Sequence, residues 1–123
     1  KEISRRPRDC QARRGVIHPM NEPSPTLADV QEFIRKMYGW KDERRGAEAT
    51  FLWFSEEVGE LAAALRESDD DALEKEFADV LAWLATLANV RGIDLGRAIR
   101  RKYGDGCPGC GQFVCDCGPT VKP

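Results

Sequence analysis

The sequence lacks any apolar run long enough to form a membrane-spanning helix. A bilayer is crossed by about 20 consecutive apolar residues, and no stretch of the 123 residues approaches that length. The basic N-terminus also lacks the continuous apolar segment of a secretory signal peptide. We therefore expect a cytoplasmic protein without a membrane partner. A charged fraction of 33% and a mean hydropathy of −0.51 are compatible with a soluble helical protein.

Histidine is scarce, and the chain has no overall positive charge. The single histidine, His18, lies in the N-terminal segment, where we interpret it as solvated rather than as a metal ligand. Residues 1–19 contain six basic and two acidic residues, so they carry +4 of a net charge of −2 and the remainder carries −6. An acidic body argues against nonspecific binding of nucleic acid. We expect no specific nucleic-acid partner.

The length fits one small domain with short appendages. Residues 1–25 have several prolines and no sustained periodicity, so we predict a basic, flexible N-terminal extension. Met20 has the character of a translation start, and residues 1–19 could be an upstream extension or, alternatively, a basic arm for a polyanion. We expect a helical domain over residues 26–104 and a cysteine-rich tail over residues 105–123.

Apolar spacing within residues 26–104 predicts four helices and hence an all-α, four-helix bundle. The expected helices span residues 27–41, 47–67, 69–90 and 94–103, with a charged loop over 42–46. Thr26 can cap the first helix, and Ser68 or Asp69 the third. Gly92 is placed to end the third helix, and Asp94 to start the fourth.

Two apolar stripes mark the faces on which the second and third helices should pack as an antiparallel hairpin. The stripes comprise Phe51, Phe54, Val58, Leu61 and Leu65 in one helix and Leu73, Phe77, Val80, Leu84 and Leu87 in the other. Leu52 and Ala63 lie off the main stripe, so apolar residues occupy both sides of the second helix. A monomer would leave part of this apolar surface exposed to solvent, and we therefore expect a homodimer.

Four acidic residues stand beside these stripes. Glu57 and Glu60 share one helix face, and so do Glu76 and Asp79. If the stripes pack together, the two acid pairs converge and repel one another unless a cation lies between them. Oxygen-only ligands favour Mg²⁺, with Mn²⁺ as a possible substitute. The alternative interpretation is a solvated acidic surface.

The pattern Glu57-x-x-Glu60, fifteen residues and Glu76-x-x-Asp79 resembles the metal-binding signature of the MazG-like, all-α nucleotide pyrophosphohydrolases. The resemblance also covers FLWFSEEVGELAAAL at 51–65, FADVLAWL at 77–84 and IDLGRAIRRK at 93–102. It implies Mg²⁺-dependent hydrolysis of a nucleoside triphosphate between the α- and β-phosphates, giving a monophosphate and pyrophosphate. It also implies dimers or tetramers and a house-cleaning role against aberrant nucleotides.

The resemblance assigns further roles residue by residue. Glu56 would accept the proton of the attacking water, with solvated surface as the alternative. Lys102 matches a basic position of the family's last helix and is the best candidate phosphate contact, while Arg101 is a weaker one. The candidates for stacking on the base or lying near it are Trp40, Trp53 and Trp83. Plain core packing is the alternative for each tryptophan.

The C-terminal tail packs four thiols into eleven residues. Cys107 and Cys110, in CPGCG, resemble a zinc knuckle, whereas Cys115 and Cys117 form a less usual CxC pair. Structural zinc is one interpretation, and disulfides or a disordered tail are the others. Disulfides do not suit a reducing cytoplasm. Cys10 is left without a visible partner.

The sequence does not identify the substrate. The same superfamily includes phosphoribosyl-ATP pyrophosphohydrolases and dUTP or dCTP hydrolases, which share the acidic quartet. Base and sugar preference depend on a few pocket contacts that the sequence does not place. A noncatalytic interaction module that uses the cysteine-rich tail is the alternative from another class, although such a module has no need for four acids.

Overall fold

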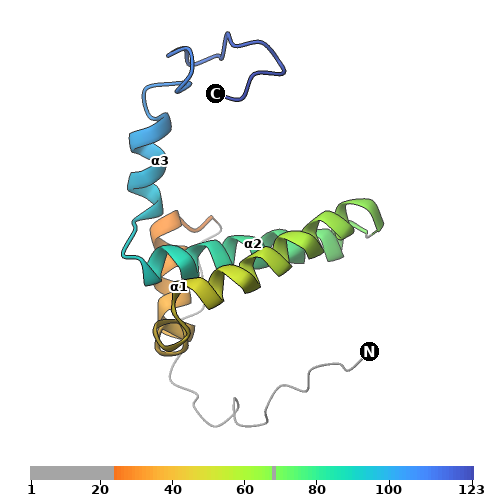
Figure 1. Ribbon diagram of the computed structural model, residues 1–123, viewed down its shortest axis with the longest axis vertical. Helices are drawn as coiled ribbons and strands as arrows, with labels where there is room; N and C mark the ends of the chain where they lie inside the picture. The colour runs from red at the N-terminus through yellow and green to blue at the C-terminus, as the bar shows by residue number, and fades with distance from the viewer. Residues whose placement is uncertain (1–23, 68) are drawn as a thin grey trace.

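The computed structural model describes residues 24–67 and 69–123, and every regular element in these residues is a helix. α1 spans Leu27–Glu67, α2 spans Asp70–Val90 and α3 spans Leu95–Tyr103 (Figure 1). The all-α prediction is confirmed. The predictions for residues 1–23, which include Cys10, His18 and Met20, and for Ser68 lie outside the described residues.

α1 is bent at Gly46, whose backbone angles are not helical, so two helical segments meet at this residue without a loop between them. The predicted loop over 42–46 is therefore wrong, because the break is confined to Gly46. Counted as continuous elements, residues 24–67 and 69–123 hold three helices, and a four-helix bundle is not confirmed. Gly46 has φ 79° and ψ 170°, a conformation open to glycine because it has no Cβ. The Thr50 hydroxyl donates to the Gly46 carbonyl at 2.7 Å and accepts from Arg45 Nε at 2.8 Å. These hydrogen bonds stabilise the bend.

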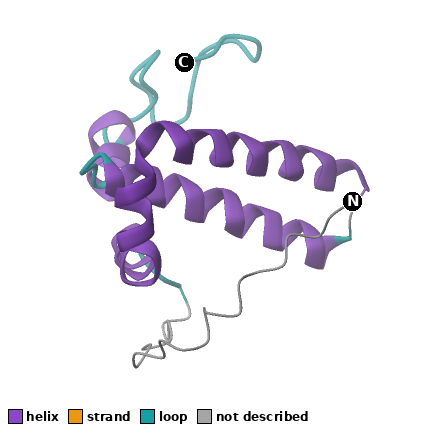
Figure 2. Ribbon diagram, turned by 60° about the horizontal axis from the view of Figure 1, so that its bottom comes forward, coloured by secondary structure: helices purple, strands orange, loops and turns teal. Residues whose placement is uncertain are grey.

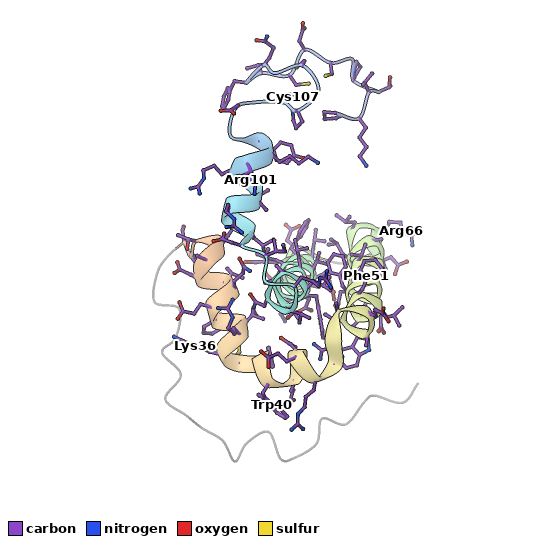
Figure 3. All side chains as sticks on the ribbon, turned by 60° about the vertical axis from the view of Figure 1, so that its left-hand side comes forward. Lys36, Trp40, Phe51, Arg66, Arg101 and Cys107 are labelled. Atoms are coloured by element: carbon purple, nitrogen blue, oxygen red, sulfur yellow. The ribbon has the colours of Figure 1, made fainter. Side chains whose placement is uncertain are left out.

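The bend gives α1 two arms that lie on either side of α2. Figure 3 looks along α2 and shows it between the two arms. The second arm and α2 run side by side as an antiparallel pair, and the C-terminal loops lie beyond them (Figure 2). This antiparallel pair is the hairpin on which the four acidic residues lie. None of the helices in the described part of the chain is long and apolar enough to cross a bilayer.

The helix ends follow the capping residues that the sequence indicated. Thr26 and Asp29 form a reciprocal capping box, with backbone-to-side-chain bonds of 2.8 and 3.1 Å. Asp69 and Asp94 each accept a backbone N–H three residues along the chain, at 2.9 and 2.8 Å. Gly92 follows the end of α2. Local sequence therefore sets these boundaries.

The start of α3 is tied to α1 by a buried amide. Gln31 is 5% exposed, and its Nε2 donates to Asn89 Oδ1 at 3.0 Å and to the Ile93 carbonyl at 2.8 Å. Gln31 Oε1 accepts from the Leu95 backbone N–H at 2.9 Å. Asn89 Nδ2 donates in turn to the Gln31 carbonyl at 2.9 Å. A buried amide satisfied in this way fixes the direction in which α3 leaves α2.

Large apolar side chains remain exposed on the hairpin. The buried apolar residues of the described chain are Ile34, Ala64, Ala85 and Ala88. The exposed members of the predicted stripes are Phe51, Val58, Leu65, Phe77 and Leu84. The buried line of the second arm runs instead through Thr50, half-buried Glu57 and Ala64, at intervals of seven residues. The prediction that the stripes form the internal face is therefore only partly right: Glu57 shares the buried face, and much of the stripes faces outward.

Candidate metal and nucleotide site

Three carboxylates meet between the second arm of α1 and α2. Glu57 from α1 and Glu76 and Asp79 from α2 each offer an oxygen, and these oxygens all lie within 4.8 Å of one another. Glu57 Oε2 and Glu76 Oε2 are buried without a hydrogen-bond partner in the described residues. An unpartnered buried carboxylate oxygen is costly, and a cation would supply the missing interaction. Their donor chemistry therefore fits a hard metal ion.

The electrostatics of Glu57 reveal the repulsion within this group. Burial, followed by the charges of Glu60, Asp79 and Glu76 in that order of importance, raises the pKa of Glu57 to about 7. A divalent cation among these carboxylates would offset the repulsion and favour the ionised form.

The remaining two glutamates of the predicted site lie at its edge. Glu60 is exposed and is not one of the three carboxylates whose oxygens converge, but it is the charge that acts most strongly on Glu57. Glu56 is exposed and also lies outside that group. The structure thus brings together three of the four expected ligands and places Glu60 next to them.

A cavity of about 310 Å³ adjoins the acidic group at Asp79. Its lining includes Tyr38, Asp42, Arg45, Trp53, Asp79 and Trp83. Ligand cavities in proteins typically measure about 300–1,000 Å³, so this one lies at the small end of that range. The first arm of α1, the second arm and α2 all contribute to it, because the bend at Gly46 folds the first arm back beside α2.

Two tryptophans form one wall of the cavity. Trp53 and Trp83 make an edge-to-face pair with ring centroids 5.4 Å apart. The Arg45 guanidinium lies 4.7 Å from the Trp53 ring centroid and 5.0 Å from that of Trp83. Trp53 is 48% exposed, so it does not pack in the core. Both rings are positioned to offer apolar surface to a ligand.

Trp40 behaves differently. It is 60% exposed, lies under Lys41 with 5.5 Å between Nζ and the ring centroid, and does not line the cavity. Its side chain appears in Figure 3 at the outer side of the bend. Core packing is therefore wrong for Trp40, and the described cavity gives it no role in base stacking.

Sequence reasoning missed Asp42 and Arg45 as members of the site. Asp42 is only 3% exposed and is ion-paired with Arg45, while its Oδ2 has no hydrogen-bond partner in the described residues. The sequence places both in a predicted charged loop, because a run of charges usually marks a solvated segment. The i, i+3 spacing of an acid and a base was the signal that could have placed them on one helix face.

The two basic candidates for phosphate binding lie elsewhere. Arg101 and Lys102 are exposed on α3, and neither lines the cavity. Lys102 Nζ lies 5.5 Å from the ring centroid of Tyr103. α3 projects away from the hairpin (Figures 1 and 3). Within one chain, the structure does not bring these side chains to the acidic group.

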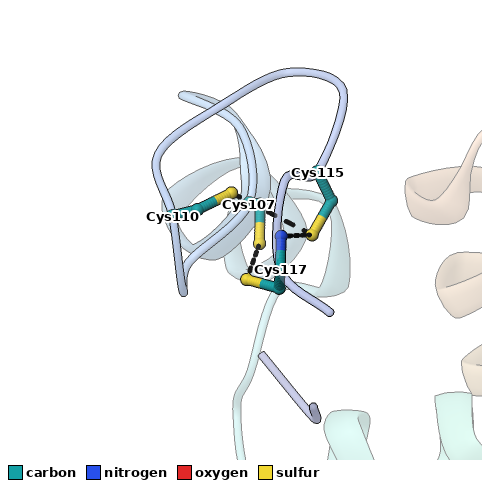
Figure 4. Close-up of side chains that lie close together, drawn as sticks. All are labelled: Cys107, Cys110, Cys115 and Cys117. Carbon is teal, nitrogen blue, oxygen red and sulfur yellow. Dashed lines mark hydrogen bonds between the residues drawn. The ribbon is translucent and has the colours of Figure 1, made fainter. Parts of the chain in front are cut away.

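A second ligand group lies beyond α3, where the sulfurs of Cys107, Cys110, Cys115 and Cys117 all come within 4.8 Å of one another (Figure 4). The four cysteines are free thiols. The backbone N–H of Asp116 is the main group that lowers the pKa of Cys110, to about 6. The Cys115 thiol is the main group that raises the pKa of Cys117, to about 12.

Comparison with known proteins identifies the family. A search of curated proteins found no match. The family model of the MazG nucleotide pyrophosphohydrolase domain matches residues 45–109, more than half of the 123-residue chain. The matched segment contains the acidic quartet, α2 and α3, and begins at Arg45. The resemblance seen in the sequence is thus confirmed, and the chain belongs to the MazG nucleotide pyrophosphohydrolase family.

Proposed function

We propose that this protein is a Mg²⁺-dependent nucleoside triphosphate pyrophosphohydrolase that cleaves between the α- and β-phosphates to give a monophosphate and pyrophosphate. One observation carries the proposal: two buried, unpartnered carboxylate oxygens lie in the Glu57–Glu76–Asp79 group, beside a cavity with a tryptophan wall. Family membership supports the reaction class. A house-cleaning role against aberrant nucleotides follows as part of the proposal.

The acidic quartet would hold the metal. Glu57, Glu76 and Asp79 supply the converging oxygens, and Glu60 would complete the set from the adjacent helical turn. A bound Mg²⁺ supplies charge neutralisation at the phosphate oxygens and acidifies a coordinated water. Mn²⁺ suits the same ligands. Exposed Glu56, beside Glu57 in the chain, would accept the proton of the attacking water once substrate orders its side chain.

The cavity would take the base and sugar. Trp53 and Trp83 present ring surfaces there. Arg45 lies over both rings and is ion-paired with Asp42. The unpartnered Asp42 Oδ2 would accept a hydrogen bond from an N–H group on the base edge. Sites that hydrogen-bond a substrate discriminate strongly against analogues without the donor, because the buried group is then left unpaired.

A homodimer would cover the exposed hairpin residues. Phe51, Leu52, Leu65 and Phe77 are 53–69% exposed on α1 and α2, which is unusual for isolated helices of a monomer. Since α3 projects away from its own hairpin, Lys102 and Arg101 would contact phosphates in the site of a second copy. Light scattering coupled to gel filtration tests the dimer, and a monomeric mass for an active sample would contradict it.

The test of the reaction is a substrate panel. The purified protein is incubated with ribo- and deoxyribonucleoside triphosphates and with phosphoribosyl-ATP, each with and without Mg²⁺, and the products are separated by chromatography. We expect monophosphate and pyrophosphate only in the presence of Mg²⁺. Diphosphate and orthophosphate would overturn the cleavage position. Turnover of phosphoribosyl-ATP alone would move the protein to that branch of the superfamily, and no turnover at all would contradict the proposal.

A further inference from the structure

We propose that the C-terminal loop is a zinc site in which Cys107, Cys110, Cys115 and Cys117 bind one Zn²⁺ as thiolates. The acidic site on the hairpin does not use these residues, so the proposal does not depend on the hydrolase reaction. The first argument is the spacing of the sulfurs. A tetrahedral ion with Zn–S bonds of about 2.3 Å places its sulfurs about 3.8 Å apart. Cys107 and Cys117 lie 4.0 Å apart, and so do Cys110 and Cys115.

The same distances oppose two disulfides. A disulfide requires an S–S distance of about 2.05 Å, whereas all four sulfurs share one volume and lie within 4.8 Å of one another. Figure 4 shows the four side chains directed at this common point. The arrangement is therefore that of a single tetrathiolate centre and not of two separate pairs.

The backbone of the loop supports thiolate sulfurs. Three sulfurs each accept a backbone N–H, at 3.3–3.4 Å: Gly109 donates to Cys107, Asp116 to Cys110 and Cys117 to Cys115. Donors of this kind fix the orientation of metal-bound ligands and stabilise their charge. The turn between the first two cysteines is closed by a bond of 2.7 Å from the Gly111 N–H to the Cys107 carbonyl.

The loop has no apolar core that could hold this shape. Its large apolar side chains point outward: Phe113 is 96% exposed, Val114 81% and Val121 59%. In small segments without a core, metal binding supplies the free energy of folding. The compact loop thus fits a structure that is ordered by its ion.

The soft donor set also selects the metal. Thiolates favour Zn²⁺, whereas the carboxylates of the hairpin favour Mg²⁺ or Mn²⁺. Binding would break up to four S–H bonds, release their protons to solvent and form four Zn–S bonds, with no change of oxidation state. The two sites can therefore be loaded independently, which makes them separable by experiment.

The experiment measures metal in the full-length protein, purified without an affinity tag and without added metal. We expect about one zinc per chain by mass spectrometry of the metal content, and after chelation and addition of Co²⁺, the visible absorption of a tetrahedral tetrathiolate site. Cys110→Ser/Cys115→Ser should lose at least nine-tenths of both signals. Cys10→Ser, the matched control at the one cysteine outside the cluster, should keep them.

Several results would overturn the site. Zinc retained in the double variant would place the metal elsewhere, and loss of zinc in Cys10→Ser would break the assignment of the ligands. Wild-type protein with four titratable thiols in the tail, but neither zinc nor the cobalt spectrum, would refute it outright. If the double variant does not fold, the cobalt titration of the wild-type chain decides alone. The helical signal of circular dichroism monitors folding in every sample.

Discussion

The acidic group on the hairpin and the cysteine group in the tail are equally compact, yet they are supported in opposite ways. Each brings its ligand atoms within 4.8 Å of one another. The carboxylates stand on capped helices whose backbone bonds are satisfied without metal, so the fold holds them together against their repulsion. The cysteines stand on a loop with exposed apolar side chains. The fold therefore imposes the acidic site, whereas at the cysteine site the ion would impose the fold.

The largest effect should come from Glu76→Gln. This change removes a ligand charge while keeping the shape, and we expect kcat/KM to fall by about 10³-fold or more, as loss of a metal ligand removes most of the metal's contribution. The metal-free protein should melt no lower than the wild type, because an unpartnered buried carboxylate has become neutral. Activity assays and thermal melts with chelator measure both effects.

Glu74→Gln is the matched control, since Glu74 is exposed on the same helix and lies outside the acidic group. It should leave turnover within about twofold, as expected for a surface change. If Glu76→Gln kept more than a tenth of the wild-type activity, the hairpin would not be the metal site.

The next effect concerns the tryptophan wall. Base–aromatic stacking is worth about 1–3 kcal/mol, so Trp83→Ala should raise KM by about 5- to 150-fold. Trp83→Phe should recover most of this loss because a ring surface remains. Trp40→Ala serves as the control, because Trp40 is exposed and does not line the cavity. Equal effects at Trp40 and Trp83 would show that the cavity is not part of the substrate site.

Removal of metal should affect the tail much more than the hairpin. A strong chelator should make the peptide bonds of residues 105–123 about tenfold more susceptible to limited proteolysis, since loss of a structural metal releases its loop. The helical circular dichroism should change little, because capped α1 and α2 do not depend on the ion. Mass spectrometry of the fragments locates the cuts. A parallel loss of helical signal and of tail protection would show that the two regions fold as one unit, and would contradict a tail that is ordered by its own ion.

The smallest effect is a pH dependence of the metal-free hairpin. The pKa of Glu57 is raised to about 7 from its usual 4.5 by burial and by facing Glu60 of α1 and Glu76 and Asp79 of α2. When the pKa of a carboxyl group is higher in the folded than in the unfolded state, its protonation stabilises the fold. This stabilisation is fully present at a pH below the pKa of the unfolded state and is lost as the pH rises through the pKa of the folded state. In chelator, the Tm should therefore drop by a few degrees between about pH 5 and 8.

Glu57→Gln should flatten this slope, because glutamine does not titrate. Mg²⁺ should reverse it, because the ion favours the ionised carboxylates. A wild-type Tm that rises over the same range, or a slope that survives Glu57→Gln, would assign the dependence to other groups.

Local features of the site could be predicted from sequence. Glu57 and Glu60 share a helix face through spacing alone, and Asp69 and Asp94 are capping residues because their short side chains reach the first free N–H groups. The four cysteines lie within eleven residues, so their proximity needs no long-range folding. Each of these inferences depends on contacts between near neighbours in the chain.

The bend at Gly46 could not be predicted in this way. A glycine among charged residues is typical of a loop, whereas in the structure the chain leaves helical geometry at Gly46 alone, and the Thr50 side chain bonds to Gly46 and Arg45 at the bend. The apolar stripes also predict the internal face only in part, because Phe51 and Phe77 remain exposed in the single chain. A hydrophobic stripe shows that a surface avoids water, but not whether its partner is another helix of the same chain.

The all-α class, the capped helix ends, the family and the pairing of acids within each helix follow from the sequence alone, since helical periodicity and capping act over three or four residues. The tertiary structure decided which carboxylates meet across the hairpin and that Asp42 and Arg45 join Trp53 and Trp83 around one cavity. These contacts link residues that are far apart in the chain. Their geometry depends on how α1 bends around α2, which no local pattern specifies.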